Sequence, residues 1–278
     1  MNDSTANDRG SNESGTSEPS STEQGTSVPL EIVYQDESLV AINKPAGLLV
    51  HRSRIDVHAT EFALQRLRDQ IQQPVFPVHR IDRPTSGVLL FALDRKIAAS
   101  VAKQFEQRTV EKTYHAIVRG FLAKEGQWDE PLVEKHDRIV DRQARKNKDA
   151  QPATTQFRSS KQWEIPFSAG KYPTSRYSLA TIRPLTGRKH QIRRHFNHMA
   201  HPIIGDTTYG DRRHNRLFIE RLCCSRLLLA ATKLTLDHPV TQARITITAG
   251  LGEAFERVIT ELDSQYISNG SPSSIESD

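Results

Sequence analysis

The most constraining stretch of this chain is a polar loop that runs directly into an apolar strand, at residues 78–91 (VHRIDRPTSGVLLF). Pro84 fixes its own φ and disfavours helix at the residue before it. Gly87 permits backbone angles that other residues resist. The apolar run over 88–92 predicts a buried strand. A single carboxylate, Asp82, therefore lies on a stiff, irregular loop whose end is fixed in the core.

Asp82 has arginines close to it on both sides in the sequence, Arg80 and Arg83. Nearby positive charge favours the ionised form of a carboxylate, so we expect these arginines to hold a charged Asp82. The alternative is a solvated turn aspartate, which is the commonest role of such a residue. Other segments must supply a site before Asp82 can be given a chemical role.

The positive charge of the chain is concentrated in its central part. The first 27 residues have a net charge of −4 and the last 16 a net charge of −3, so the +5 of the whole chain leaves +12 on residues 28–262. A basic folded part suits a polyanionic partner such as a nucleic acid. Charge alone is equally compatible with a soluble basic protein that binds no polyanion.

Both ends of the chain differ in composition from the rest. Residues 1–27 are rich in Ser, Thr, Asn, Gly and Glu, and such a segment cannot bury enough apolar surface to offset the entropy of ordering. We expect a disordered acidic tail at 1–27, one folded domain at 28–264 and a second disordered tail at 265–278. The chain also lacks a secretory signal pattern and an apolar run of about 18 residues, so we expect no membrane association.

The cysteine content indicates the cellular compartment. Cys223 and Cys224 are the only cysteines, and they are adjacent. Such a pair forms neither a metal ligand set nor a secreted disulfide framework and indicates reducing conditions. We therefore expect a cytoplasmic protein.

Hydrophobic periodicity predicts a succession of hairpins and helices. Ile97, Val101 and Phe105 give residues 95–108 one apolar face, and Asp94 can cap this helix. The order of elements predicts an α+β fold. We expect further helices at 59–73 and 253–262, and strands at 30–35, 39–43, 75–78, 110–120, 127–133, 154–163, 174–185, 233–237 and 244–248.

A metal or nucleotide cofactor is not indicated. The spacing of His190, His195, His198 and His201 lacks the usual pair four residues apart with a Glu between them. The chain contains neither a Walker loop nor a G-x-G-x-x-G segment. We therefore expect neither a metal ion nor a cofactor.

The string HRIDRPTSG (79–87), followed by its apolar strand, closely resembles the signature of the RluA-type RNA pseudouridine synthases. The segments NKPAGLLVH (43–51), KTYHAIVRG (112–120) and TGRKHQIRRH (186–195) are similar to further motifs of that family, and the similarity extends over residues 30–262. The resemblance implies the pseudouridine synthase fold, a mixed, largely antiparallel sheet flanked by helices with a basic central cleft. It also implies a cofactor-free isomerisation of uridine to pseudouridine in RNA.

The resemblance also assigns roles to individual residues. It makes Asp82 the catalytic residue and Arg193 the arginine that pairs with its carboxylate. Tyr114 would stack on the target base with its hydroxyl near the site of proton transfer. Leu229 would contact the base from beneath, and Arg80 would support the site.

One position departs from the family pattern. The family usually reads Leu-His-Ala where this chain has Leu-Ala-Ala at 229–231. The change puts in doubt any hydrogen bond that the histidine makes in other members. It leaves the carboxylate of Asp82 untouched.

RNA is the expected partner, bound mainly through its phosphates. The stretch 135–148 is basic, and either a phosphate-gripping loop or a solvated loop fits it. We expect the protein to act as a monomer. The residues that we expect to contact RNA are Arg83, Lys112, Arg142, Arg145, Arg188 and Lys189.

Within the family, LEIVYQDESLVAINKP (30–45) and TGRKHQIRRH (186–195) are most similar to the type that modifies uridine 65 of tRNA. The alternatives are a member that acts on ribosomal RNA and a non-catalytic RNA-binding protein. A glycosidic hydrolase would need a second catalytic acid, whereas the motifs offer one acid among arginines.

Overall fold

The structure is a computed structural model that describes residues 28–51, 61–133 and 149–266. The acidic tail expected at 1–27, most of the tail expected at 265–278, and Arg142 and Arg145 lie outside the described residues. Among the described helices, none is long and apolar enough to cross a membrane.

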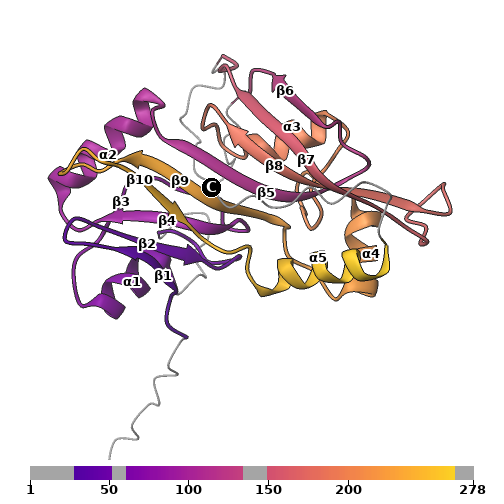
Figure 1. Ribbon diagram of the computed structural model, residues 1–278, viewed down its shortest axis with the longest axis horizontal. Coiled ribbons are helices and arrows are strands. Elements are labelled where there is room, and N and C mark those ends of the chain that lie inside the picture. Colours follow the sequence, from indigo (N-terminus) through magenta and orange to yellow (C-terminus); the bar gives the residue numbers. More distant parts are fainter. Residues whose placement is uncertain (1–27, 52–60, 134–148, 267–278) are drawn as a thin grey trace, which may run out of the picture.

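The described elements form one mixed sheet with helices on both of its faces (Figure 1). The strands are β1 (Ile32–Gln35), β2 (Leu39–Lys44), β3 (Phe76–Pro77), β4 (Ser86–Ala92), β5 (Glu111–Arg119), β6 (Glu125–Asp129), β7 (Thr154–Ile165), β8 (Ser175–Pro184), β9 (Leu229–Asp237) and β10 (Arg244–Thr248). The helices are α1 (Ala63–Ile71), α2 (Arg95–Gln107), α3 (Gln191–His198), α4 (Arg212–Leu222) and α5 (Glu253–Gln265).

The sheet follows the order β1-β2-β4-β9-β5-β8-β7-β6, with β3 paired to β4 and β10 paired to β9. The β4–β9 pair is parallel, and the other strand pairs are antiparallel. The expected α+β class and the mixed, largely antiparallel sheet are therefore confirmed. The parallel pair joins the N-terminal half of the sheet to the C-terminal half.

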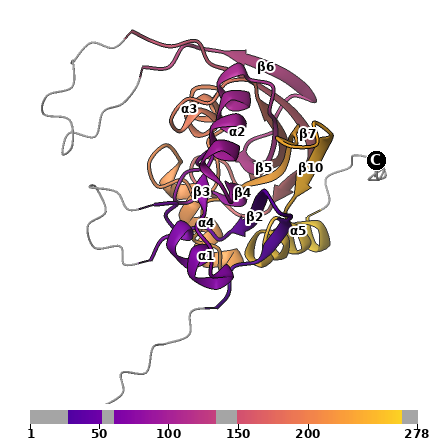
Figure 2. The ribbon, with the colours of Figure 1, turned by 90° about the vertical axis from the view of Figure 1, so that its left-hand side faces the viewer.

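Alternation along the central strands buries both faces of the sheet. On β4, Val88 and Leu90 face the apolar cluster under α2, whereas Leu89 and Phe91 face the cluster under α1. Figure 2 shows α2 and α1 on opposite sides of these strands. Strands buried on both faces read as a continuous apolar run rather than an alternation, as the 88–92 run does.

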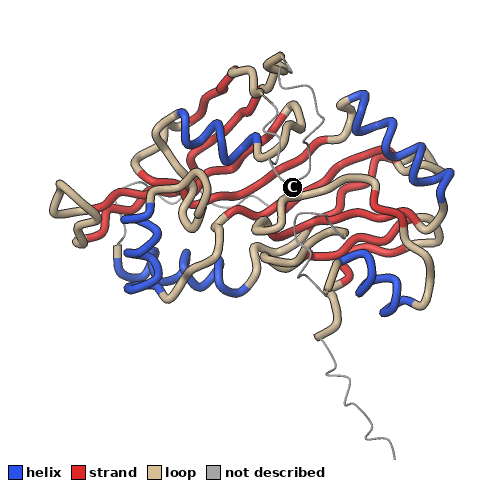
Figure 3. Tube along the Cα trace, turned by 180° about the vertical axis from the view of Figure 1, so that it is seen from behind, coloured by secondary structure: helices blue, strands red, loops and turns tan. Residues whose placement is uncertain are grey.

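The C-terminal half of the sheet is covered in the same way. Ala116 and Val118 of β5 pack in a cluster with α3, while Ile117 packs in a cluster with α4 and α5. Seen from behind, helices lie above and below the strands in both halves of the sheet (Figure 3). The active-site candidates on β5 therefore share a face with α3.

Several elements differ from their expected bounds. Helix α4 was not expected, although Asp211 caps it and Leu217, Phe218 and Leu222 form its buried side. The expected strand at 127–133 is β6, which begins at Glu125 and ends at Asp129. The strand expected at 233–237 begins at Leu229, because its first residues are buried without any polar alternation.

The junction between β4 and β9 depends on a glycine. Gly87 has a φ of +109°, and a Cβ atom added there would lie 2.0 Å from the carbonyl oxygen of Ala231. No side chain fits between the two backbones at that distance. The motif glycine after the Asp82 loop is therefore required by the parallel pairing of the two halves.

We expect Gly87→Ala to lower the free energy of unfolding by roughly 3 kcal/mol or more, since backbone strain and overlap with β9 add together. Gly47→Ala is the matched control: Gly47 has a φ of +90° but an added Cβ meets nothing within 4 Å. It should cost only about 1–2 kcal/mol from strain. Urea unfolding followed by circular dichroism measures both, and equal losses would contradict the overlap argument.

Candidate active site

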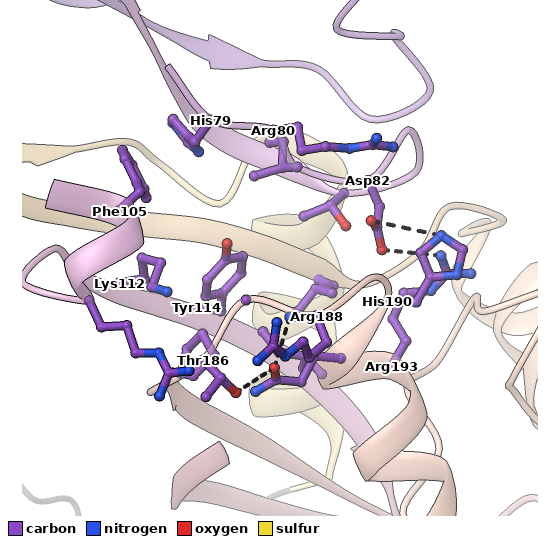
Figure 4. Close-up of a pocket in the computed structure, with 18 of the residues that line it drawn as sticks. His79, Arg80, Asp82, Phe105, Lys112, Tyr114, Thr186, Arg188, His190 and Arg193 are labelled. Atoms are coloured by element: carbon purple, nitrogen blue, oxygen red, sulfur yellow. Dashed lines mark hydrogen bonds and ion pairs between the residues drawn. The ribbon is translucent and has the colours of Figure 1, made fainter. Parts of the chain in front are cut away.

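The main candidate site is a cavity of about 430 Å³ where the two halves of the sheet meet (Figure 4). Its walls come from the loop after β3, the end of α2, the start of β5, the turn before α3, and the start of β9. The residues that argue for chemistry among its lining are Arg80, Asp82, Arg108, Lys112, Tyr114, Arg188, His190, Arg193 and Leu229.

The loop that carries Asp82 is held by backbone hydrogen bonds. Thr85 donates its N–H to the carbonyl of Asp82 at 3.0 Å, which closes a turn. The carbonyl of Arg83 accepts from the N–H of Gly47 at 2.8 Å and from Nζ of Lys44 at 3.1 Å. The NKPAG segment therefore fixes the loop from beneath.

Lys44 is a buried anchor of this loop. Its side chain is fully buried, and Nζ also donates to the carbonyls of Pro45 and Leu48, at 2.8 and 2.9 Å. Burial, and then the positive charge of Arg226, lowers the pKa of Lys44 to about 7. The NKPAG segment thus contacts the loop that carries Asp82 through the Lys44 side chain and the Gly47 backbone.

The guanidinium of Arg193 has two acidic partners. The first of them is the carboxylate of Asp82. Nη1 of Arg193 donates to Oδ2 of Asp82 at 3.3 Å across 111 residues of sequence. Nε and Nη2 of Arg193 donate to the two oxygens of Asp206, at 2.7 and 2.9 Å. The side chains of Arg193, Asp206 and Asp82 are 4%, 1% and 20% exposed. The Arg193–Asp206 pair is thus buried, whereas the carboxylate of Asp82 is partly exposed to the cavity.

Asp206 bonds the backbone of the turn that follows it as well as Arg193. Its Oδ1 accepts from the backbone N–H groups of Thr208 and Tyr209, both at 2.9 Å. Burial raises the pKa of Asp206, but the Arg193 guanidinium and these N–H groups outweigh it and leave that pKa below its usual value. Asp206 therefore stays ionised and holds Arg193 in place.

The cationic partner of Asp82 is Arg193, whereas we expected Arg80 and Arg83. Nε of Arg83 donates to the carbonyl of Gly47 at 3.0 Å. Arg80 is exposed and lines the cavity. In this turn the side chain of Arg83 is directed to Gly47 and not to Asp82. The charge partner of Asp82, Arg193, comes from α3.

Tyr114 and Lys112 lie side by side on β5, across the cavity from Asp82 (Figure 4). Burial, and then the Asp82 carboxylate, raises the pKa of Tyr114 above its usual value, so its hydroxyl stays protonated at neutral pH. Leu229 lines the same cavity and is 2% exposed. All three side chains therefore lie around the same cavity as Asp82.

Ala230, where the family usually has His, faces away from this cavity. Its side chain packs in the cluster with α4 and α5, whereas Leu229 packs in the cluster with α3. The departure from the family pattern therefore falls in the apolar core and not on the lining of the cavity.

The expected RNA contacts divide into two groups. Lys112 and Arg188 line the cavity, and Nε of Arg188 donates to the carbonyl of Pro152 at 3.2 Å. Among the described residues that line it, neither Arg83 nor Lys189 appears. Lys189 also precedes α3, which begins at Gln191.

The turn before α3 is built by a side chain that the sequence analysis passed over. Oε1 of Gln191 accepts from Oγ1 of Thr186 at 2.7 Å and from the N–H of Arg188 at 3.0 Å. Its Nε2 donates to the carbonyl of Thr154 at 2.9 Å.

The sequence analysis also gave no functional role to His190 and Tyr209, although His190 belongs to the TGRKHQ string. Among the described residues, no three His, Cys, Asp or Glu side chains are grouped to hold a metal ion.

Comparison with known proteins gives the class to which this site belongs. A family model described as RNA pseudouridylate synthase matches residues 38–198. The solved structure of "Human RNA Pseudouridylate Synthase Domain Containing 1" is similar with a TM-score of 0.65 and 25% identity, covering 93% of this chain and 94% of that one. The chain belongs to the RNA pseudouridylate synthase family.

Curated relatives are considerably closer in sequence. The "tRNA pseudouridine synthase C" of Vibrio cholerae is 54% identical over 84% of this chain and 95% of its own length. The protein of the same name from Haemophilus influenzae is 52% identical over 84% of this chain and 97% of its own length. The chain is thus similar to these relatives over nearly their whole extent.

We expect Asp206→Asn to lower the free energy of unfolding at pH 7 by about 3 kcal/mol, since removal of one partner leaves the buried guanidinium less compensated. A carboxyl whose folded-state pKa is depressed contributes stability above its unfolded pKa and loses it as the pH falls through the folded one. The deficit of the variant should therefore shrink below about pH 4.

Urea unfolding at a series of pH values measures this deficit. Asp94→Asn is the control, because an Asn caps α2 as well as an Asp does, and it should change little at any pH. A deficit of Asp206→Asn that stayed constant with pH would refute the charge argument.

Proposed function

We propose that this protein isomerises a uridine of tRNA, at position 65, to pseudouridine, with Asp82 as the catalytic group. The observation that carries the proposal is a partly exposed carboxylate on a pinned loop, paired with Arg193 at the wall of the cavity. The near relatives bear the name tRNA pseudouridine synthase C, which favours tRNA over ribosomal RNA. The cavity volume falls within the roughly 300–1,000 Å³ of small-molecule pockets, which suits a single flipped nucleotide.

The reaction takes place on a nucleotide that has left its stack. Flipping the target uridine costs a few kcal/mol, which the binding of the surrounding RNA offsets. Asp82 then acts on the nucleotide as nucleophile or base, and the glycosidic bond breaks. The base turns and its carbon 5 bonds to the sugar; carbon 5 then loses its proton and ring nitrogen 1, freed from the sugar, takes one up, so that the product is an isomer of the substrate. No electrons or groups are exchanged with another molecule, so the reaction needs no cofactor.

Each side chain around Asp82 has a distinct part in this scheme. Arg193 orients the carboxylate, since a guanidinium forms directed bonds with carboxylates. The ring of Tyr114 stacks on the uracil, and its protonated hydroxyl is available as a donor. Leu229 supports the base from beneath. Arg80, on the exposed side of the cavity, contacts the RNA around the flipped nucleotide.

The organisation of the chain is part of the same proposal. Residues 28–264 form the catalytic domain, which acts as a monomer because one chain supplies the described lining of the cavity. Cys223 and Cys224 are free thiols, which suits a cytoplasmic enzyme. Light scattering on the purified protein tests the monomer.

We expect Asp82→Asn to lower the rate of pseudouridine formation by more than about 10³-fold, since an amide is neither a base nor a nucleophile. The assay is position-resolved pseudouridine mapping on tRNA incubated with each protein. Asp94→Asn serves as the control that keeps full activity. Unchanged turnover in Asp82→Asn would refute the role of Asp82, and release of free uracil would identify a hydrolase instead.

We expect Arg188→Ala to weaken tRNA binding and to lower the slope of log affinity against log salt by about 1, since one phosphate contact is lost. Arg216→Ala on α4 is the control, because Arg216 is exposed, pairs with Glu220 and lies outside the cavity lining. Filter binding at several salt concentrations measures both slopes. Equal slopes for the two variants would remove Arg188 from the RNA contacts.

A further inference from the structure

The two oxygens of Asp82 have different neighbours. Oδ2 accepts from Arg193 at 3.3 Å, whereas Oδ1 lies 3.8 Å from Nε2 of His190. The second distance is too long for a hydrogen bond but short enough to close with a small movement. Figure 4 shows His190 and Arg193 side by side against the carboxylate.

His190 has a backbone conformation that few residues other than glycine adopt. Its backbone is left-handed, with a φ of 56° at the N-cap of α3. Its Nδ1 lies 3.0 Å from the hydroxyl of Tyr209, and the two rings meet edge to face with centroids 5.7 Å apart. The imidazole is therefore fixed at its far end, and Nε2 is aimed at Asp82.

Tyr209 is itself fixed by the group that fixes Arg193. Its backbone N–H donates to Oδ1 of Asp206 at 2.9 Å. The guanidinium of Arg193 lies over its ring, 5.2 Å from the centroid, in a cation–π contact. Asp206 thus holds both Arg193 and Tyr209, and these two residues in turn contact Asp82 and His190.

Burial influences the His190 imidazole more strongly than the charges around it do. The charged groups that face it are Asp82, Asp206, Arg193 and Lys189, and burial, which acts more strongly than any of them, leaves its pKa below the usual value. A neutral imidazole carries one N–H. When the Tyr209 hydroxyl donates to Nδ1, that N–H is on Nε2 and faces the carboxylate; the other tautomer would put a lone pair against it.

We propose that His190 is a positioning residue that donates a hydrogen bond from Nε2 to Oδ1 of Asp82 when the substrate fills the cavity, with Tyr209 fixing its tautomer. Catalytic hydrogen bonds are often long in the free enzyme and tighten in the complex. Arg193 and His190 would then orient one carboxylate oxygen each. This inference rests on the proposed function of Asp82.

The variants are chosen to separate this role from a purely structural one. His190→Ala removes the donor, and His190→Gln keeps an N–H donor on the same left-handed backbone. Tyr209→Phe removes only the hydroxyl and keeps the ring that contacts Arg193. His198→Gln is the matched control on the same helix, because His198 pairs with Glu130 away from the cavity.

We expect His190→Ala to lower kcat by about tenfold to a hundredfold at unchanged KM, since a misplaced reacting group costs rate of that order. His190→Gln should recover most of the loss, and His198→Gln should match the wild type. Tyr209→Phe should lower kcat by less than His190→Ala does, because the imidazole stays in place and only its tautomer is no longer fixed. The double variant Tyr209→Phe with His190→Ala should be no slower than His190→Ala alone.

A second measurement does not depend on activity. In ¹⁵N NMR spectra of the imidazole at pH 7, His190 should carry its proton on Nε2 in the wild type, and Tyr209→Phe should mix the two tautomers. A proton on Nδ1 in the wild type would overturn the inference, whether or not the protein modifies tRNA. A kcat of His190→Ala within twofold of an active wild type would overturn it and leave the proposed function intact, whereas an inactive wild type would remove the proposed function and with it the part of His190 in the reaction.

Discussion

The structure depends on one buried guanidinium shared by two carboxylates. A buried charge is tolerated only when it is paired and hydrogen-bonded, and Asp206 meets this need for Arg193 with two bonds of 2.7 and 2.9 Å. Because Asp206 already neutralises Arg193, the third bond, at 3.3 Å to Asp82, is an addition. Asp82 is therefore held by a cation whose charge is largely compensated, which leaves the carboxylate oriented but still able to react at the cavity.

The two halves of the sheet bring Asp82 and Arg193 together. The loop with Asp82 belongs to the N-terminal half, and α3 with Arg193 belongs to the C-terminal half; the parallel β4–β9 pair joins them. Gly87 allows the backbones to approach there, and Lys44 fixes the loop from the other side. The position of the carboxylate, where an error of about 1 Å can cost a hundredfold in rate, thus depends on Gly87 and Lys44, neither of which lines the cavity.

The sequence predicted those parts of the site that lie within one segment. Proline, glycine and an apolar run sufficed to place Asp82 on a stiff loop before a buried strand, and Asp94 was correctly read as a helix cap. Proximity in sequence was misleading for charge: the neighbouring Arg80 and Arg83 do not pair with Asp82 in the described structure, and Arg193 was assigned only through the family resemblance. The bidentate pair of Asp206 could not be inferred, because no periodicity relates a turn aspartate to an arginine on a separate helix.

The face of β9 on which a residue lies determines whether its substitution changes the cavity or the apolar core. In β9, Leu229 lies on the side of α3 and the cavity, and Ala230 lies on the side of α4 and α5, because side chains alternate along a strand. A histidine at 230 would have to bury its ring nitrogens among the apolar residues of α4 and α5, where each needs a partner. Alanine at 230 avoids that requirement. The chain can therefore differ from its family at the residue next to Leu229 and still present the same wall to a uracil.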